Sequence, residues 1–210
     1  MVKKFLFIDD HRVVRESFTK ILSEPFKPVQ VEQASNGEEA IAKIKKEHFD
    51  LIVMDVQMPE TSTPDLVDFI ISYSPGTKIL MLSMAPETIY AKRFLNAGAS
   101  GYISKEASLD EVIKAIELIL QGRKYVSERL RDSIIKDSFG KNETSNPFNK
   151  LSNREFEIVS LLLQGKSVSD ISSILHRSAS TIGTHKARLM EKLNVSNLVE
   201  LMDVAAVHNL

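Results

Sequence analysis

The sequence predicts two domains: a doubly wound α/β domain with a five-stranded parallel sheet, followed by an all-α domain of four short helices. Over residues 1–125, short runs of β-branched and aromatic residues alternate with stretches whose apolar residues have helical spacing, which is typical of doubly wound sheets. From Leu151 onward only helical spacing remains. A chain of 210 residues is long enough for two such domains.

The strands of the first domain are expected where apolar runs are short and bounded by turn residues. Five runs meet this description: Lys4–Ile8, Val29–Gln33, Leu51–Met54, Lys78–Leu82 and Gly101–Ser104. Between and after them, apolar residues three and four positions apart indicate one buried face of a helix. Helices are expected from about His11 to Ser23, after Asn36-Gly37, around Leu66–Ile70, from about Ile89 to Gly98, and from Ser108 to Gly122.

Residues 126–149 break this alternation. Val126–Ser138 has a thin apolar stripe compatible with one helix, whereas Phe139–Lys150 is rich in turn residues and has no stripe. We interpret 126–149 as an interdomain linker and 150–210 as the second domain.

The second domain begins with a capping box, in which Ser152 and Glu155 start a helix that ends at Gly165. Ser167 and Asp170 repeat the box and start a second helix, expected to end near His176. A third helix is expected over Ala179–Leu193 and a fourth after Ser196. Four short helices joined by tight turns are typical of a helix-turn-helix module.

Composition excludes several classes of function. The chain has no cysteine, so disulfides and thiolate chemistry are absent. No apolar run approaches the roughly 20 residues that span a bilayer, and the one after Lys4 is interrupted by Asp9 too soon for a signal peptide. A cytoplasmic protein is therefore expected. The net charge is −1, so any nucleic-acid binding requires a local positive surface.

Polar residues stand where four of the predicted strands end. Asp9 and Asp10 follow the first strand, Asp55 the third, Ser83 the fourth and Lys105 the fifth. Because the carboxyl ends of parallel strands meet at one edge of a sheet, these side chains are expected to converge. Three carboxylates, a hydroxyl and an ammonium group suit a magnesium ion and a phosphoryl group.

This arrangement resembles the receiver domain of two-component response regulators, over roughly residues 1–125. The resemblance implies that Asp55 accepts a phosphoryl group from a sensor histidine kinase and that Ser83 and Lys105 contact the phosphoryl oxygens. It implies Mg²⁺ held by Asp9, Asp10 and Asp55, with the backbone carbonyl of Gln57 completing the protein ligands. Ser83 and Tyr102 match the family's switch residues.

Blander interpretations stay open for each of these residues. Asp55 and Ser83 could simply start a loop or cap a helix, and the Asp9-Asp10 pair could be a solvated turn. Lys105 could be a surface lysine, and Tyr102 a half-exposed strand tyrosine, because most aromatic residues in strands simply pack.

The second domain resembles the DNA-binding domain of the NarL/FixJ group, also called LuxR-type. The resemblance rests on Leu151-Ser152-x-Arg154-Glu155, Gly165-Lys166-Ser167, Ser178-x-x-Thr181-Ile182-x-x-His185 and Lys192-Leu193-x-Val195. It implies a phosphorylation-controlled transcription factor that binds double-stranded promoter DNA and is a homodimer when active. The fourth helix, Asn197–Val207, has an apolar stripe that is either a core face or partly a dimer surface.

The third helix is expected to enter the major groove. Base-facing positions fall near Gly183, Thr184 and Ala187, so base readout is either sparse or uses Thr184 with the Ala187 methyl group against thymine. His185 is expected to be packed and hydrogen-bonded. The full set of expected DNA contacts, in which each charged residue could instead be an ordinary solvated charge, is Lys166, Arg177, Thr181, Gly183, Thr184, Lys186, Ala187 and Arg188.

One departure and two alternatives accompany this interpretation. The loop Glu60–Asp65 after the acceptor lacks the glycine common in the family, which bears on kinase choice and dephosphorylation. A phosphatase of the haloacid dehalogenase type uses similar groups but requires Asp-x-Asp rather than adjacent acids, so an enzyme is not expected. A regulator that acts through protein contacts, with weak DNA binding, stays open because of Gly183 and Ala187.

Overall fold

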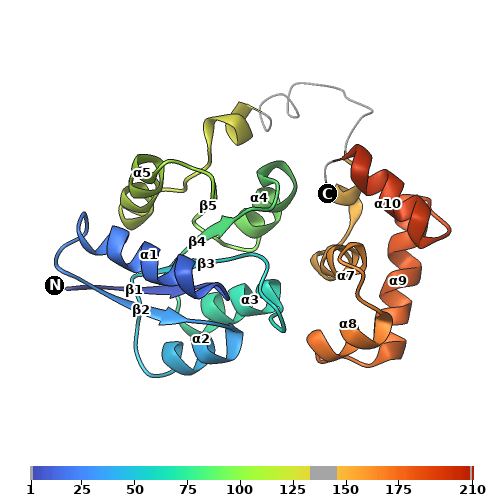
Figure 1. Cartoon of the computed structure of the whole chain (residues 1–210), viewed down its shortest axis with the longest axis horizontal. Coiled ribbons are helices and arrows are strands. Elements are labelled where there is room, and N and C mark those ends of the chain that lie inside the picture. The colour runs from blue at the N-terminus through green and yellow to red at the C-terminus, as the bar shows by residue number, and fades with distance from the viewer. Residues whose placement is uncertain (1, 133–145, 209) are drawn as a thin grey trace. The chain divides into compact units, whose positions relative to one another are not determined.

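The computed structural model describes residues 2–132, 146–208 and 210. The chain divides into two compact units, residues 1–134 and 135–210. Figure 1 shows the first as a sheet with helices around it and the second as helices alone. The α/β and all-α classes expected from the sequence are both confirmed.

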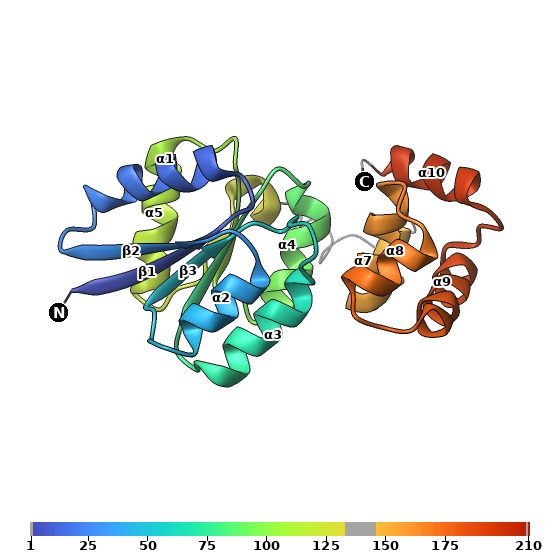
Figure 2. The ribbon, with the colours of Figure 1, turned by 60° about the horizontal axis from the view of Figure 1, so that its bottom comes forward.

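The first unit is built on a parallel five-stranded sheet with the order β2-β1-β3-β4-β5. Figure 2 shows α1 and α5 on one side of it and α2, α3 and α4 on the other. The strands are β1 Lys3–Ile8, β2 Val29–Ala34, β3 Leu51–Met54, β4 Lys78–Ser83 and β5 Gly101–Ser104. The helices are α1 Arg12–Ser23, α2 Gly37–Ile44, α3 Thr63–Tyr73, α4 Glu87–Asn96 and α5 Leu109–Leu120.

Both faces of the sheet are buried. Phe7, Val53 and Leu82 belong to the cluster that packs beneath α1 and α5. Ile52 and Met54, which alternate with them, are also without exposed surface. This explains why the central strands read as continuous apolar runs rather than as alternating ones.

The strand register aligns the carboxyl ends of the sheet. Ile8 lies opposite Met54, and Met54 lies opposite Met81. Ser83 lies opposite Ser104 at the end of the β4–β5 ladder. The residues that follow these ends therefore share one edge of the sheet, as the sequence predicted.

Residues 124–130, which we call the strap segment, remain attached to the first unit. Tyr125 forms an isolated bridge to Gly101 of β5, and its N–H donates to the Ser100 carbonyl at 2.9 Å. Leu130 is only 2% exposed, and residues 128–132 are helical. The expected helix 126–138 is thus described only in part, because residues 133–145 lie outside the described residues; the linker boundaries stay a prediction.

The second unit consists of a short 3₁₀ helix, η1 Pro147–Lys150, and four α-helices. These are α7 Asn153–Leu163, α8 Val168–Ile174, α9 Ala179–Leu193 and α10 Leu198–Val207. Both expected capping boxes are present, at Ser152 and Ser167. The second helix ends two residues before the expected His176, which adopts a left-handed φ of 48°.

Phe148 is a core residue that the sequence interpretation assigned to the linker. It is completely buried and lies edge-on to His208, with ring centroids 6.2 Å apart. The turn-rich stretch around it has no periodic apolar pattern, so its burial depends on contacts formed only in the folded unit.

Glu155 connects the start of α7 to α9. Its side chain is buried, completes the capping box with Ser152, and accepts a hydrogen bond from Lys192 Nζ at 2.7 Å. Burial opposes ionisation, but the hydrogen bonds from Lys192 and Ser152 outweigh it and hold the pKa of Glu155 below its ordinary value. A carboxyl group with a lowered pKa stabilises the folded state above the unfolded pKa and loses that contribution as the pH falls.

We therefore expect Glu155→Gln to destabilise the second unit at pH 7 by about 1–2 kcal/mol, because a charge-assisted hydrogen bond is lost. The difference should begin to shrink as the pH falls below about 4.5, where the unfolded chain binds a proton at Glu155, and should vanish once the pH is below the lowered pKa of the folded protein. Hydrogen exchange of peptides from 150–207, corrected for intrinsic rates, measures this. Glu191→Gln on the exposed side of α9 is the matched control, and wild-type protection in Glu155→Gln at pH 7 would contradict the prediction.

Candidate functional site

The acidic site lies at the carboxyl edge of the first unit's sheet. Main-chain bonds extend the strand ladders into it: Asp9 N–H donates to the Ala34 carbonyl at 3.2 Å, and Asp55 N–H donates to the Ile8 carbonyl at 2.9 Å. Asp9 and Asp55 are buried, at 0% and 5% exposure. The backbone therefore holds two carboxylates at fixed positions, close together and out of water.

Lys105 supplies the cation that these carboxylates require. Its Nζ donates a hydrogen bond to Asp55 Oδ2 at 2.7 Å and lies 2.6 Å from Asp9 Oδ2. Burial raises the pKa of the Asp55 carboxyl, and the contact with Lys105 offsets only part of that effect. Burial also opposes the charge on Lys105, but Asp55 and Asp9 outweigh it and raise the pKa of the lysine. Lys105, whose side chain is 12% exposed, is thus a charged partner of these carboxylates and not a surface lysine.

His11 is a member of the site that the sequence interpretation treated only as a helix start. Its backbone N–H donates to Asp9 Oδ1 at 2.8 Å. Its Nδ1 lies 2.8 Å from Asp10 Oδ1 and 3.3 Å from Asp9 Oδ1. The sequence could have indicated this role, because His11 directly follows the acid pair and an imidazole can donate a hydrogen bond to a carboxylate.

The donor set fits a divalent cation. Asp9, Asp10, His11 and Asp55 each offer one ligand atom, and these atoms lie within 4.8 Å of one another. Asp9 Oδ2 and Asp10 Oδ1 are buried, and each lies close to one side-chain nitrogen, Lys105 Nζ at 2.6 Å and His11 Nδ1 at 2.8 Å. A carboxylate oxygen has about two acceptor positions, so each can also bind a metal ion. Oxygen-rich sites of this kind suit Mg²⁺. Gln57 has an exposed side chain, and its N–H donates to Asp55 Oδ1 at 3.3 Å.

Ser83 and Tyr102 meet at the loop that joins β4 to α4. The Ser83 hydroxyl accepts from the Ala85 N–H at 3.0 Å, and the Tyr102 hydroxyl donates to the Ala85 carbonyl at 2.9 Å. Both side chains are fully buried, so the half-exposed alternative for Tyr102 is wrong. Burial raises the pKa of the Tyr102 phenol, which keeps it neutral and able to donate. One short loop therefore joins the site hydroxyl to the buried tyrosine.

The loop after Asp55 is anchored by hydroxyl groups in place of the glycine that it lacks. Glu60 adopts a left-handed φ of 55°, which costs a non-glycine residue about 1–2 kcal/mol. Thr61 Oγ1 accepts from the Gly37 N–H at 3.0 Å, and Thr63 Oγ1 donates to the Val56 carbonyl at 2.8 Å. These bonds hold the strained backbone and attach the loop to the start of α2.

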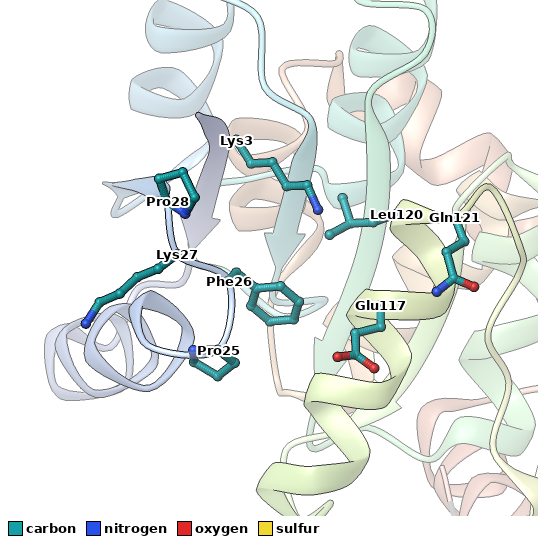
Figure 3. A pocket seen from close by; sticks show the side chains of 8 residues that line it. All are labelled: Lys3, Pro25, Phe26, Lys27, Pro28, Glu117, Leu120 and Gln121. Atoms are coloured by element: carbon teal, nitrogen blue, oxygen red, sulfur yellow. The ribbon is translucent and has the colours of Figure 1, made fainter. Parts of the chain in front are cut away.

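A hollow of about 470 Å³ lies at the edge of the sheet where the strands begin, opposite the acidic site. Figure 3 shows its lining from the segment between α1 and β2, from the start of β1 and from the end of α5. The lining residues are Lys3, Pro25, Phe26, Lys27, Pro28, Glu117, Leu120 and Gln121. Glu117 is the only carboxylate among these lining residues, so this hollow does not repeat the acidic cluster of the carboxyl edge.

In the second unit, α9 presents one side to solvent. Ile182, Leu189 and Leu193 are buried and define its inward face. Of the residues predicted to contact DNA, Lys166 and Arg177 lie outside α9 and the others belong to it. Those that are exposed are Lys166, Arg177, Thr181, Gly183, Thr184, Ala187 and Arg188, and Lys186 is half-buried. His185 is half-buried as expected, but its Nδ1 is buried and forms no hydrogen bond within the described part of the chain.

Comparison with known families agrees with this geometry. Residues 5–117 match the response regulator receiver domain, and residues 149–205 match the bacterial regulatory proteins of the luxR family. The chain belongs to the response regulators that combine a receiver domain with a LuxR-type DNA-binding domain and regulate transcription.

Individual relatives match over nearly the whole chain. Response regulator GacA of Pseudomonas syringae pv. syringae (strain B728a) is 33% identical over 207 residues, covering 99% of this chain and 97% of GacA. Response regulator UvrY of Escherichia coli (strain K12) is 32% identical over 206 residues, covering 98% of this chain and 94% of UvrY. The structure of RcsB from Salmonella enterica serovar Typhimurium bound to the promoter rprA has a TM-score of 0.78 at 25% identity. The match covers 98% of this chain and 99% of the RcsB chain.

These matches bear on the alternatives. The family is a transcription-regulating one and not a typical enzyme family, which disfavours the phosphatase interpretation. Among the described residues, no helix is long and apolar enough to cross a membrane.

We expect Lys105→Met to raise the pKa of Asp55 further, because the hydrogen bond from Lys105 is what opposes the effect of burial. The carboxyl ¹³C shift of Asp55, titrated by NMR in metal-free protein, measures this. Lys92→Met, at an exposed position of α4, is the control. An Asp55 pKa that is unchanged or lower in Lys105→Met would show that the lysine does not set the ionisation of the site.

Proposed function

We propose that Asp55 is the phosphoacceptor and that its modification controls DNA binding by the second unit. The observation that supports this most is the placement of the Asp55 carboxylate: it is buried, charge-paired with Lys105 and adjacent to Asp9 and Asp10. An Asp55 oxygen would attack the phosphorus of a histidine kinase's phosphohistidine. The new oxygen–phosphorus bond forms as the bond to the histidine nitrogen breaks. Lys105 and Ser83 would contact the phosphoryl oxygens.

Asp9, Asp10 and Asp55, with the Gln57 carbonyl, would hold Mg²⁺. The ion would neutralise part of the charge that an incoming phosphoryl group adds to a site already rich in carboxylates. The closeness of the carboxylate oxygens of Asp9, Asp10 and Asp55, which lie within 4.8 Å of one another, supports this assignment.

The switch would begin at Ser83. For its hydroxyl to donate to a phosphoryl oxygen, the side chain must reorient relative to the Ala85 N–H from which it now accepts. Tyr102 is bonded to the Ala85 carbonyl, so movement of this loop and of the tyrosine would be coupled. A phosphoryl group shifts the population only by the contacts that it makes in one state and not in the other, and Ser83 and Lys105 would supply them.

The strap segment offers a path from this loop toward the linker. Glu87, in the first turn of α4, accepts from the Ser127 hydroxyl at 2.6 Å and from its N–H at 3.3 Å. At the other end of α4, Lys124 Nζ donates to the Leu95 carbonyl at 3.2 Å. Because both ends of α4 hold this segment, a displacement of α4 by the β4–α4 loop would displace the beginning of the linker.

The second unit would bind promoter DNA with α9 in the major groove. Lys166, Arg177, Lys186 and Arg188 would contact phosphates, and Thr181 would lie beside them at the start of the helix. This activity places the chain in the cytoplasm with its DNA target.

Dimerisation would use part of α10, whose apolar stripe would then serve both roles left open by the sequence, core face and dimer surface. Leu201 and Ala205 are buried in the unit, whereas Leu198 and Met202 are 40% and 51% exposed. The exposed pair would contribute to a surface for a second copy, which paired half-sites require.

Incubation with acetyl phosphate and Mg²⁺ should add one phosphoryl group to the wild type by intact mass, and none to Asp55→Asn. Chelation should stop the labelling, because the acidic cluster then repels the anion. Asp110→Asn, an acid at an exposed position of α5, is the control and should label fully. Labelling of Asp55→Asn at the wild-type level would sink the assignment.

Ser127→Ala should leave labelling of Asp55 unchanged but weaken the coupling to DNA binding. In the wild type, phosphorylation is expected to tighten DNA binding and to favour the dimer. In Ser127→Ala both effects of phosphorylation should be smaller, because the Glu87–Ser127 contact is lost. DNA titration and light scattering with and without phosphodonor measure both effects. Ser72→Ala, at an exposed position of α3, is the control. If phosphorylation increased the DNA affinity of Ser127→Ala as much as that of the wild type, the strap segment would not couple the acidic site to DNA binding.

A further inference from the structure

Arg15, in the first turns of α1, binds the backbone of the acid pair. Its Nη1 donates to the Asp9 carbonyl at 2.6 Å and to the Asp10 carbonyl at 3.0 Å. Its own backbone N–H donates to the His11 carbonyl at 3.1 Å. The carbonyl groups of Asp9, Asp10 and His11, which follow one another along the chain, are therefore all bound by one residue.

The acid pair lies where neither a strand nor a helix fixes the backbone. β1 ends at Ile8 and α1 begins at Arg12. Carbonyl groups that leave a sheet ladder need donors from elsewhere, because a buried carbonyl without a partner is unfavourable. The start of α1 has no side-chain cap that could order this segment. The guanidinium of Arg15, with its donors in one plane, orders it instead.

Arg15 is in turn tied to the sheet. It is half-buried, and its carbonyl accepts from Thr19 Oγ1 at 2.8 Å. Gln33 Nε2 of β2 donates to Thr19 Oγ1 at 2.9 Å. The next residue of β2, Ala34, accepts from the Asp9 N–H. The acid pair is thus connected to β2 both directly and through α1.

Two roles are conceivable for a cation at this place, and they predict opposite effects. By charge alone, removal of Arg15 makes the site more negative and should tighten the binding of a divalent cation. Removal of the two hydrogen bonds frees the backbone of Asp9 and Asp10, so their carboxylates no longer have a fixed position. Mg²⁺ demands near-ideal octahedral geometry, and this loss should weaken its binding.

We propose that Arg15 is a positioning residue of the metal site, whose guanidinium orients the backbone of Asp9 and Asp10 so that their carboxylates converge on Mg²⁺. The contacts carry this assignment, because both hydrogen bonds of Nη1 go to main-chain carbonyls of these two residues. It rests on the Mg²⁺ binding proposed above and adds a residue outside the ligand set.

The test titrates Mg²⁺ into the full chain and follows the backbone amide NMR signals of residues 8–12. In Arg15→Met the dissociation constant for Mg²⁺ should rise about tenfold to a hundredfold, the usual cost of losing a hydrogen-bond partner of a metal ligand. Arg15→Lys keeps the charge but not the planar group with its several donors, so its dissociation constant should lie between those of the wild type and Arg15→Met.

Arg12→Met is the matched control. Arg12 belongs to the same helix, but its side chain is exposed and donates to Glu16 Oε1 at 2.7 Å. This variant loses a cation near the acidic cluster without losing a bond to the acid pair. Its affinity for Mg²⁺ should therefore equal or exceed that of the wild type.

Labelling with acetyl phosphate separates positioning from a general loss of structure. In Arg15→Met the Mg²⁺ concentration for half-maximal labelling should rise by the same factor as the dissociation constant. The labelling rate at saturating Mg²⁺ should stay that of the wild type, because the bound ion then holds the carboxylates itself. A general loss of structure would lower the rate at every Mg²⁺ concentration.

Mg²⁺ binding in Arg15→Met that is as tight as in the wild type, or tighter, would overturn the positioning role and leave the metal site in place. A lower labelling rate at saturating Mg²⁺ in both Arg15→Met and Arg15→Lys would also overturn it, since Arg15 would then act on the fold. A wild type whose amide signals and labelling do not respond to Mg²⁺ would instead overturn the metal site itself.

Discussion

The buried contact of Lys105 with Asp55 and Asp9 is the constraint on which the first unit depends. Two carboxylates out of water repel each other and lose hydration, and a buried charge without a partner is strongly destabilising. The ladder bonds that extend β1 and β3 bring Asp9 and Asp55 together, and the end of β5 places the ammonium group between them. The strand ends of the sheet thus bring together charges that could not be buried singly.

The surroundings of this charge cluster connect it to the rest of the chain. Ser83 and Tyr102 share the β4–α4 loop through Ala85, and α4 carries that loop to Glu87 and Ser127. Each step is a hydrogen bond or a short stretch of helix, with no gap to be crossed. The proposed phosphoryl site and the strap segment therefore belong to one contiguous network of contacts. Such a network becomes a switch only if it has two arrangements, and the phosphoryl contacts would favour one of them.

The second unit obtains its stability in another way. Its helices are short, and short helices depend on caps and on packing more than on intrinsic propensity. Two capping boxes, the Glu155–Lys192 contact and the buried Phe148 hold its framework without using the outward face of α9. The exposed side chains of that face are consequently not needed for the framework, and under the proposed function they would contact DNA.

The sequence by itself determined the elements and most of the acidic site. Strands buried on both faces read as continuous apolar runs, capping boxes are local, and acids at strand ends identify the site edge because parallel strands end together. Only the tertiary structure placed His11 against the acid pair, buried Phe148, oriented Tyr102 inward and joined Ser127 to Glu87. The physical reason is separation along the chain. A periodic pattern records which face of an element is buried, whereas a contact such as Ser127–Glu87, between residues 40 positions apart, exists only once the sheet and helices have brought its partners together.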